Sequence, residues 1–219
     1  MITWFLDIWR ADDKVLPESS PDCIIALSYV VKRGALTNGT REVLLRVIEY
    51  WKKFPLAIIA FANSSHCFPG SDTVEEKLKY QLIDKARIPR SFVFSCGSAM
   101  NTVTEAEAIC RGLQLAEFYP KNLLIVTGLL HSRGARFVWE RTAPRYFKGV
   151  RIHIAVISLE YEYQKDHPLM FQRGLGRWIF ANIARQAALR ILGLQFVRKV
   201  HDPTIKINRV RCKYLHHDK

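Results

Sequence analysis

The sequence predicts an α/β protein: a three-layer open sheet of about five mainly parallel strands, followed by a basic helical extension at the C-terminus. Three observations favour this class. Short apolar runs typical of buried strands alternate with longer segments of helical periodicity. Polar turns containing Gly or Pro separate the two kinds of segment, and no internal repeat is present. Strands joined in this way pair in parallel, because a helix carries the chain back across the sheet before each new strand.

The first half of the chain contains two predicted strands and two predicted helices. They span residues 23–31 (strand), 40–53 (helix), 56–62 (strand) and 72–86 (helix). The first strand is a near-continuous apolar run, which indicates that both of its faces are covered. Thr40 can cap the first helix, and Asp72 or Thr73 the second. Pro89 lies just beyond the second helix, where a proline commonly follows a helix end.

The second half contains three further strands and two helices. They span residues 92–95 (strand), 102–118 (helix), 123–127 (strand), 134–141 (helix) and 151–157 (strand). Pro120 separates the first helix from the strand that follows it. The run at 123–127 consists of apolar and β-branched residues, as buried strands do. These elements place an α/β domain at residues 1–166 and a separate extension at 167–219.

The extension carries most of the net charge of +13. Residues 167–219 contain eleven Lys or Arg against two acids, whereas residues 1–166 contain 22 against 18. Such a segment is attracted to polyanions, and an anionic membrane surface is the partner we consider for residues 168–219. A solvated tail with no specific partner is the alternative. Nucleic acid is disfavoured, because no basic–aromatic motif of a known reader is present.

A helix is expected at 176–193 within this extension, and its apolar residues do not form one clean stripe. Docking on the flank of the sheet is the first expectation for it, and a membrane interface the second. The five cysteines are odd in number and lack a C-x-x-C motif, which predicts reduced thiols. Residues 1–9 are apolar but too short for a membrane span and lack a basic segment before them. We therefore expect a cytoplasmic protein, with peripheral association to the inner membrane as the alternative.

Polar side chains follow several of the predicted strands, and the carboxyl ends of parallel strands meet at one edge of a sheet. Carboxylates and imidazole can move protons, so the acid/base candidates are His131, Glu105 and Glu75. Hydroxyls, amides and guanidiniums can hold an anion. The ligand-binding candidates of this kind are Arg41, Asn63, Ser64, Ser98, Asn101, Thr102, Thr127, Arg133 and Arg136. Simpler interpretations are a capping box at Thr102 and Glu105, a structural hydrogen bond at His131, and solvated arginines.

Several of these motifs also follow the order of a known family. They are Thr40-Arg41-Glu42, Asn63-Ser64-Ser65 with Glu75, Arg87-Ile88-Pro89, Ser98 to Glu105, and Val126-Thr127-Gly-Leu-Leu-His131-Ser-Arg133-Gly134-Ala135. Over residues 22–157 the chain resembles the SanA/YdcF-like family, bacterial proteins of poorly defined function with a Rossmann-like domain and frequent links to the cell envelope. The resemblance implies a Rossmann-like sheet and a ligand site formed by these motifs.

The chain departs from the family pattern at two places. Asn63-Ser64-Ser65 replaces the usual Ser-Gly-Gly, and Gly134 stands where an arginine is expected. Arg133 or Arg136 would have to supply that charge, and both departures suggest altered chemistry.

Two functions follow as hypotheses. The first is an enzyme of cell-envelope metabolism acting on a phosphorylated or nucleotide-like small molecule, and the second is a non-catalytic, membrane-associated module that senses such a ligand. No G-x-G-x-x-G, P-loop or G-x-S-x-G motif is present, which disfavours dinucleotide dehydrogenases, P-loop NTPases and acyl-transfer triads. No zinc motif is present either; magnesium held by Glu75 or Glu105 stays open, and the sequence predicts no particular cofactor.

Overall fold

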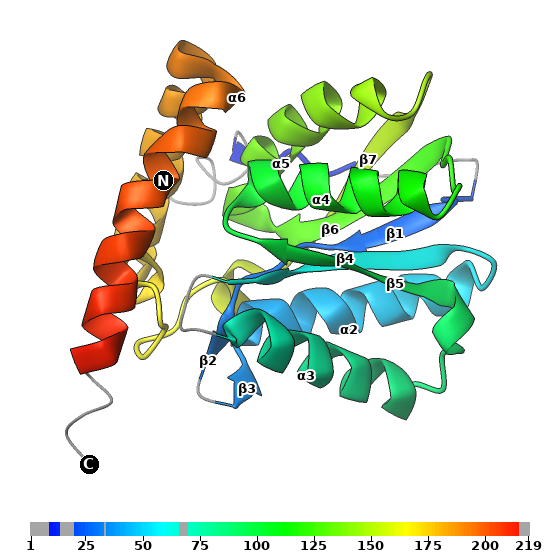
Figure 1. Cartoon of the computed structure of the whole chain (residues 1–219), viewed down its shortest axis with the longest axis horizontal. Coiled ribbons are helices and arrows are strands. Elements are labelled where there is room, and N and C mark those ends of the chain that lie inside the picture. The colour runs from blue at the N-terminus through cyan, green and yellow to red at the C-terminus, as the bar shows by residue number, and fades with distance from the viewer. Residues whose placement is uncertain (1–8, 14–19, 33, 66–69, 215–219) are drawn as a thin grey trace.

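The computed structural model describes residues 9–13, 20–32, 34–65 and 70–214, with side chains up to residue 194. The N-terminal residues 1–8 and residues 66–69 of one predicted site loop lie outside the described part. Five strands form one parallel sheet in the order β5-β4-β1-β6-β7 (Figure 1). They are β1 (Cys23–Ala26), β4 (Ile58–Ser64), β5 (Val93–Ala99), β6 (Asn122–Gly128) and β7 (Arg151–Ile157).

Helices cover both faces of this sheet. In Figure 1, α2 (Asn38–Lys53) and α3 (Ser71–Lys85) lie below it, while α4 (Thr102–Leu115) and α5 (Leu129–Thr142) lie above it. The three-layer, Rossmann-like α/β class is thus confirmed. The smaller elements are an antiparallel hairpin of β2 (Val31–Lys32) and β3 (Ala35–Leu36) and 3-10 turns at Arg90–Phe92, Ala143–Arg145, Leu159–Tyr161 and Met170–Gln172.

The order of the strands places a crevice beside β1. From β1 the chain adds β4 and β5 on one side, and then returns through α4 to add β6 and β7 on the other. Such a reversal separates the loops that follow β1 and β6, because their helices α2 and α5 turn to opposite faces. Open α/β sheets bind their ligands at this point, outside the carboxyl ends of the strands.

The central strands are buried on both faces, as their continuous apolar sequence predicts. Alternate side chains of β1 join different layers: Cys23 and Ile25 pack with α4 and α5, and Ile24 and Ala26 pack with α2. Cys23, Cys96 and Cys110 are free thiols. Within the part of the chain that the structure describes, no helix combines the length and apolar character needed to span a bilayer.

Two element boundaries differ from the sequence prediction in ways that matter for the site. The strand predicted at 23–31 ends at Ala26, and Val30 takes a positive φ of 66° as the chain turns toward β2. The helix predicted at 134–141 begins at Leu129, so His131 lies in its first turn and not in a loop. The helix can begin this early because Glu162, 32 residues away in the chain, accepts a hydrogen bond from the Leu130 amide. This amide is one of the helix N-terminal N–H groups that have no partner within the helix.

The helix expected at 176–193 is the first half of α6 (Leu175–Tyr214), which is broken at Gly193 with φ 75° and ψ 172°. This half packs against α5 and α4 at the carboxyl edge of the sheet (Figure 1). The packing is close at Gly134, where an added Cβ would lie 2.7 Å from Nε2 of Gln186. The first expectation for this helix is docking on the flank of the sheet; in the structure it packs instead on the helices α5 and α4.

Candidate functional site

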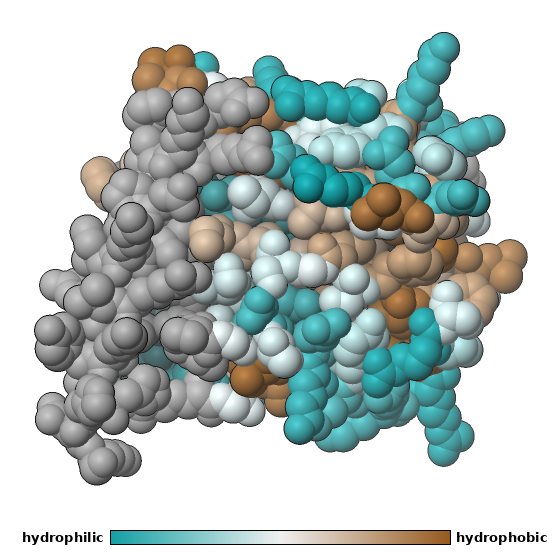
Figure 2. Space-filling model, viewed as in Figure 1, coloured by the Kyte–Doolittle hydropathy of each residue, from teal (hydrophilic) through white to brown (hydrophobic). Residues whose placement is uncertain are grey.

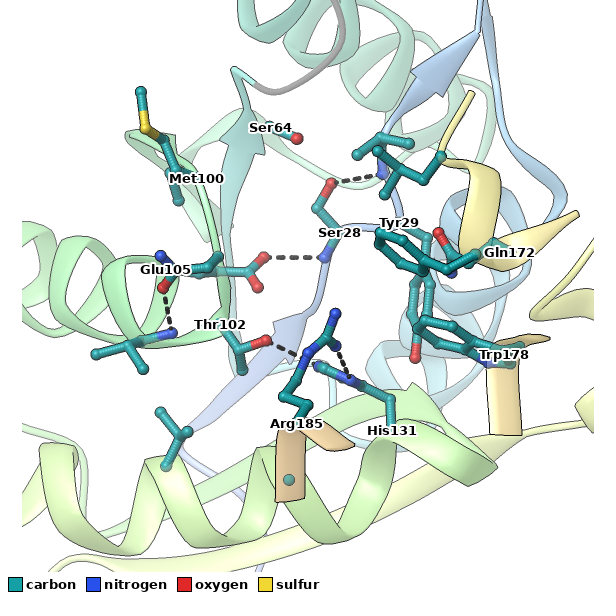
Figure 3. A pocket seen from close by; sticks show the side chains of 18 of the residues that line it. Ser28, Tyr29, Ser64, Met100, Thr102, Glu105, His131, Gln172, Trp178 and Arg185 are labelled. Atoms are coloured by element: carbon teal, nitrogen blue, oxygen red, sulfur yellow. Dashed lines mark hydrogen bonds between the residues drawn. The ribbon is translucent and has the colours of Figure 1, made fainter. Parts of the chain in front are cut away.

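A cavity of about 120 Å³ lies at the carboxyl edge of the sheet, beside β1 and β6. Its walls come from the loops after β1 and β5, the end of β4, the first turns of α4 and α5, the segment 169–172 and α6 (Figure 3). Six of the predicted site residues line it: Asn63, Ser64, Asn101, Thr102, Glu105 and His131. The tertiary structure therefore brings together half of the predicted set at the crevice that the strand order creates.

His131 is held by a hydrogen bond at each ring nitrogen. The guanidinium of Arg185 donates to Nδ1 across 3.2 Å, and Nε2 lies 2.9 Å from the hydroxyl of Thr102 (Figure 3). Since Nδ1 accepts, the proton of the neutral ring sits on Nε2 and is donated to Thr102. Burial, followed by the positive charge of Arg185, lowers the pKa of His131 to about 3, so the imidazole is neutral at physiological pH.

Arg185 is a half-buried guanidinium in the pocket wall. It lies over the rings of Phe171 and Trp178, with distances of 5.9 and 5.7 Å to the ring centroids. Among the described residues, no carboxylate lies within ion-pair distance of it. Burial lowers its pKa, but arginine stays protonated in proteins. The pocket thus contains a positive charge that no described carboxylate neutralises.

Glu105 is a buried carboxyl in the first turn of α4, and one of its oxygens accepts from the Ser28 amide at 2.9 Å. Burial raises its pKa to about 8, although Lys79 and the Ser28 amide act in the opposite direction. The group is therefore mainly protonated at pH 7. The capping box belongs to other residues: Asn101 is the N-cap and Thr104 its partner, so Glu105 is not explained by capping.

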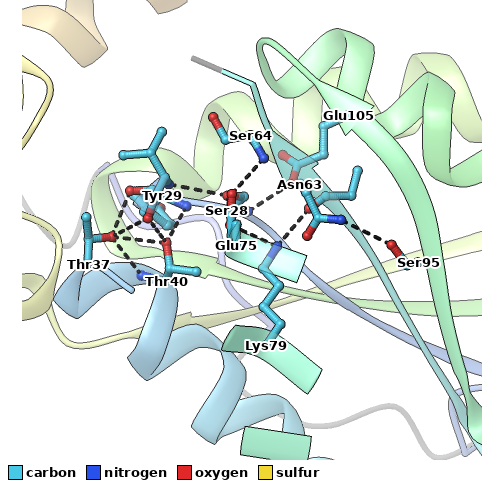
Figure 4. A network of polar contacts seen from close by, with 12 residues as sticks. Ser28, Tyr29, Thr37, Thr40, Asn63, Ser64, Glu75, Lys79, Ser95 and Glu105 are labelled. Atoms are coloured by element: carbon cyan, nitrogen blue, oxygen red, sulfur yellow. Dashed lines mark hydrogen bonds and ion pairs between the residues drawn. The ribbon is translucent and has the colours of Figure 1, made fainter. Parts of the chain in front are cut away.

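Glu75 lies behind the pocket wall rather than in it. Its carboxylate pairs with Lys79 of the same helix at 2.9 Å, and both side chains are fully buried. One oxygen accepts from the Ser64 amide at 2.7 Å, and the other from the Ser28 hydroxyl (Figure 4). Glu75 thereby ties the loop after β1 to the end of β4, which is a positioning task. Among the described residues no group of three or more His, Cys, Asp or Glu could hold a metal ion.

Asn63 contributes an unsatisfied acceptor to the pocket. Its side-chain nitrogen donates to Ser95 Oγ at 3.1 Å, while its Oδ1 is buried without a hydrogen-bond partner among the described residues. Buried polar atoms of this kind are uncommon and costly.

The other predicted site residues lie outside the pocket wall. Arg41 is exposed on α2, and Ser98 donates to Asp72 at the surface. Thr127 is fully buried and shares a hydrogen bond with the Tyr29 hydroxyl. The remaining two are Arg133 and Arg136, the arginines expected to replace the missing family charge. The guanidinium of Arg133 lies 6.0 Å from the ring centroid of Trp9. Arg136 donates hydrogen bonds to the Asp13 carboxylate and to the Ala11 carbonyl.

The N-terminus of α5 is already occupied by a carboxylate of the chain itself. Glu162 is buried, with one oxygen accepting from the Leu130 amide at 2.9 Å and the other from Trp178 Nε1 at 3.0 Å. An added Cβ on Gly128 would lie 2.3 Å from this carboxylate. Burial raises the pKa of Glu162 to about 7, against the effect of these donors. Helix N-termini at such positions commonly bind phosphate, and here the internal carboxylate takes that place.

Comparison with known proteins identifies no relative of this chain. No family model matches the chain, and no curated protein or solved structure matches it significantly.

Sequence reasoning missed the residues that α6 and the preceding segment bring to the site. The most important are Arg185, Trp178, Phe171, Gln172 and Glu162. Glu162 lies in the segment after β7, but the other four follow no strand, so the rule that located the other candidates does not reach them. One signal was present in the helix at 176–193: positions 178, 182, 185, 186 and 189 share one helical face that mixes large apolar with polar side chains.

Proposed function

We propose that this protein binds a phosphorylated or nucleotide-like small molecule in the pocket at the carboxyl edge of its sheet. The observation that carries the proposal is the Arg185 guanidinium, which faces the pocket without a carboxylate partner among the described residues. Glu105 is mainly protonated and His131 is neutral at pH 7, given pKa values of about 8 and about 3. The pocket is thus positively charged, and an anionic group would neutralise it.

The walls suggest how such a ligand would be held. Tyr29, Phe171 and Trp178 give the pocket an aromatic wall, in which Trp178 stacks on Phe171. Arg185 would hold the anion from the pocket wall. A cavity of about 120 Å³ is smaller than the usual site for a whole cofactor, so it suits one ring or one phosphate of a larger molecule.

Glu105 is the proton donor or acceptor that we assign to an enzyme with this pocket. A general acid or base works best when its pKa lies near the working pH, and burial brings the pKa of Glu105 to about 8. His131 receives a positioning role, because both of its nitrogens are engaged. The same engagement favours the second candidate, a non-catalytic, membrane-associated sensing module that uses the identical pocket.

Kinship with the SanA/YdcF-like family, and with it a role in cell-envelope metabolism, is part of this proposal and rests on the sequence motifs. Gly134, at the family's arginine position, lies directly beneath Gln186 of α6. Arg185 is the neighbour of Gln186 and reaches His131 from that helix. Arg185, and neither Arg133 nor Arg136, would therefore replace the family's charge.

A thermal-shift screen tests the proposal. Inorganic phosphate, nucleotides and S-adenosyl compounds would be added to the full chain, to an Arg185→Gln variant and to an Arg190→Gln control, which removes the same charge from an exposed site of the same helix. We expect at least one anionic compound to raise the Tm of the wild type and the control but not of Arg185→Gln. If none raises the Tm of the wild type, the proposal is wrong in both forms. Turnover of the stabilising compound, lost in Glu105→Gln, would distinguish enzyme from sensor.

A further inference from the structure

The first half of α6 has two apolar faces. Its inner face is buried against the body of the protein through Trp178 and Leu189, among others. Its outer face exposes Phe180, Ile183 and Ile191, whose side chains are 73%, 41% and 79% exposed. The sequence shows no single stripe along this helix because apolar residues occupy both faces. In Figure 2, hydrophobic side chains are visible at the upper left, where this half of α6 ends.

The exposed apolar residues form one row along the helix, because spacings of three and four residues relate their positions. We call this row the outer stripe, and its members are Phe180, Ile183, Ala184, Ala187 and Ile191. Arg177 is exposed beside one edge of the stripe, and Arg190 beside the other. No acidic residue occurs between residues 175 and 193.

We propose that the outer stripe docks α6 in the plane of an anionic membrane surface. Exposed apolar side chains bordered by arginines, without acids, match an acyl layer covered by negative headgroups. A second copy of the chain fits less well, since a twofold contact would bring the arginines of two such helices together with no acid on this half of α6 to neutralise them. Nucleic acid would leave the apolar row unburied. Residues 195–219 are also basic, with seven Lys or Arg and two acids. Their charge strengthens the attraction to such a surface.

The proposed docking face and the ligand pocket share one helix. Arg185 and Trp178 line the pocket from the inner side of α6, while Phe180 and Ile183 are exposed on the outer side. Membrane docking does not depend on the proposed ligand, and either proposal can fail without the other.

Flotation of the full chain with lipid vesicles tests the docking surface. We expect the wild type to float with vesicles that contain phosphatidylglycerol, and not with pure phosphatidylcholine. Phe180→Glu/Ile183→Glu should weaken binding at least about tenfold, because it removes apolar contacts and adds repulsion. Replacing Arg177 and Arg190 with Gln should cost about fivefold per arginine, and added salt should weaken binding of the wild type.

Two matched variants separate the stripe from general effects. Leu56→Glu/Leu115→Glu introduces the same change at exposed leucines far along the chain from α6, and Lys52→Gln/Lys53→Gln removes the same charge from other exposed sites. Both should float as the wild type does. The proposal is overturned if the wild type fails to bind anionic vesicles, or if the stripe variant binds as well as its control. It is also overturned if the stripe variant instead dissolves a dimer seen by light scattering.

Discussion

The guanidinium of Arg185 on α6 donates a hydrogen bond to Nδ1 of His131 on α5, across 3.2 Å. The two residues lie 54 positions apart in the chain. This contact sets the tautomer of the imidazole and turns its Nε2 proton toward Thr102. The C-terminal extension is thereby a structural part of the site.

Removing the guanidinium should raise the pKa of His131. Burial is the larger cause of the lowered value, and the positive charge of Arg185 the second. In Arg185→Gln the pKa should therefore rise but stay below the ordinary 6.5. The measurement is an NMR titration of the His131 ring protons, with Arg190→Gln as control. An unchanged His131 pKa in Arg185→Gln would contradict the contact.

Glu105 should make the protein less stable as the pH rises toward 8. Its pKa in the folded state, about 8, lies above the ordinary 4.5. A carboxyl with a raised pKa contributes stability that is fully present below the ordinary value and is lost as the pH rises through the folded one, with a slope of at most ~1.4 kcal/mol per pH unit. Urea unfolding at pH 5 to 8 should show a shallower decline for Glu105→Gln than for the wild type. The exposed Glu160→Gln should keep the full decline.

The buried pair of Glu75 and Lys79 should be strongly coupled. Lys79→Met leaves the Glu75 carboxylate buried without its partner and should cost ~3–5 kcal/mol of unfolding free energy. The double variant Glu75→Gln/Lys79→Met should lose less than the two single variants added together. Denaturant unfolding of all four proteins measures this, and simple additivity would mean that the pair is not coupled.

Two glycines should differ in how much stability a methyl group costs. An added Cβ on Gly128 meets the Glu162 carboxylate at 2.3 Å and the Tyr29 hydroxyl at 2.4 Å, inside the core, so Gly128→Ala should cost ~1–3 kcal/mol. At Gly134 the Cβ meets only the movable end of Gln186. Because alanine also favours a helix interior, Gly134→Ala should cost less than ~1 kcal/mol. Thermal unfolding compares the two, and equal losses would argue against this packing.

Removing the Glu162 carboxylate should open the N-terminus of α5 to an external anion. The Leu130 amide that now donates to Glu162 would then face phosphate or sulfate, as helix N-termini commonly do. Glu162→Ala should lose stability in chloride and recover part of it in phosphate at equal ionic strength. Glu160→Ala, at an exposed neighbouring site, should show no such recovery in thermal-shift measurements. A Tm of Glu162→Ala that is insensitive to phosphate would contradict the prediction.

The fold could be predicted because its signals are local. Consecutive residues form the apolar runs of β4, β6 and β7 and the helical segments between them. Parallel pairing of the strands follows from the alternation of strands and helices. The same rule places the loops after the strands at one edge, which is why Asn63, Thr102 and His131 were predicted together and line one pocket.

The rest was decided by contacts between distant parts of the chain. Whether Glu75 faces the pocket or the core depends on Lys79 and on two loops that it joins. Arg136 is drawn to Asp13, and Arg185 is brought to His131 only when α6 docks over Gly134. A sequence pattern shows that a charge exists, but its partner, its burial and so its chemistry are set by packing energies summed over the whole fold.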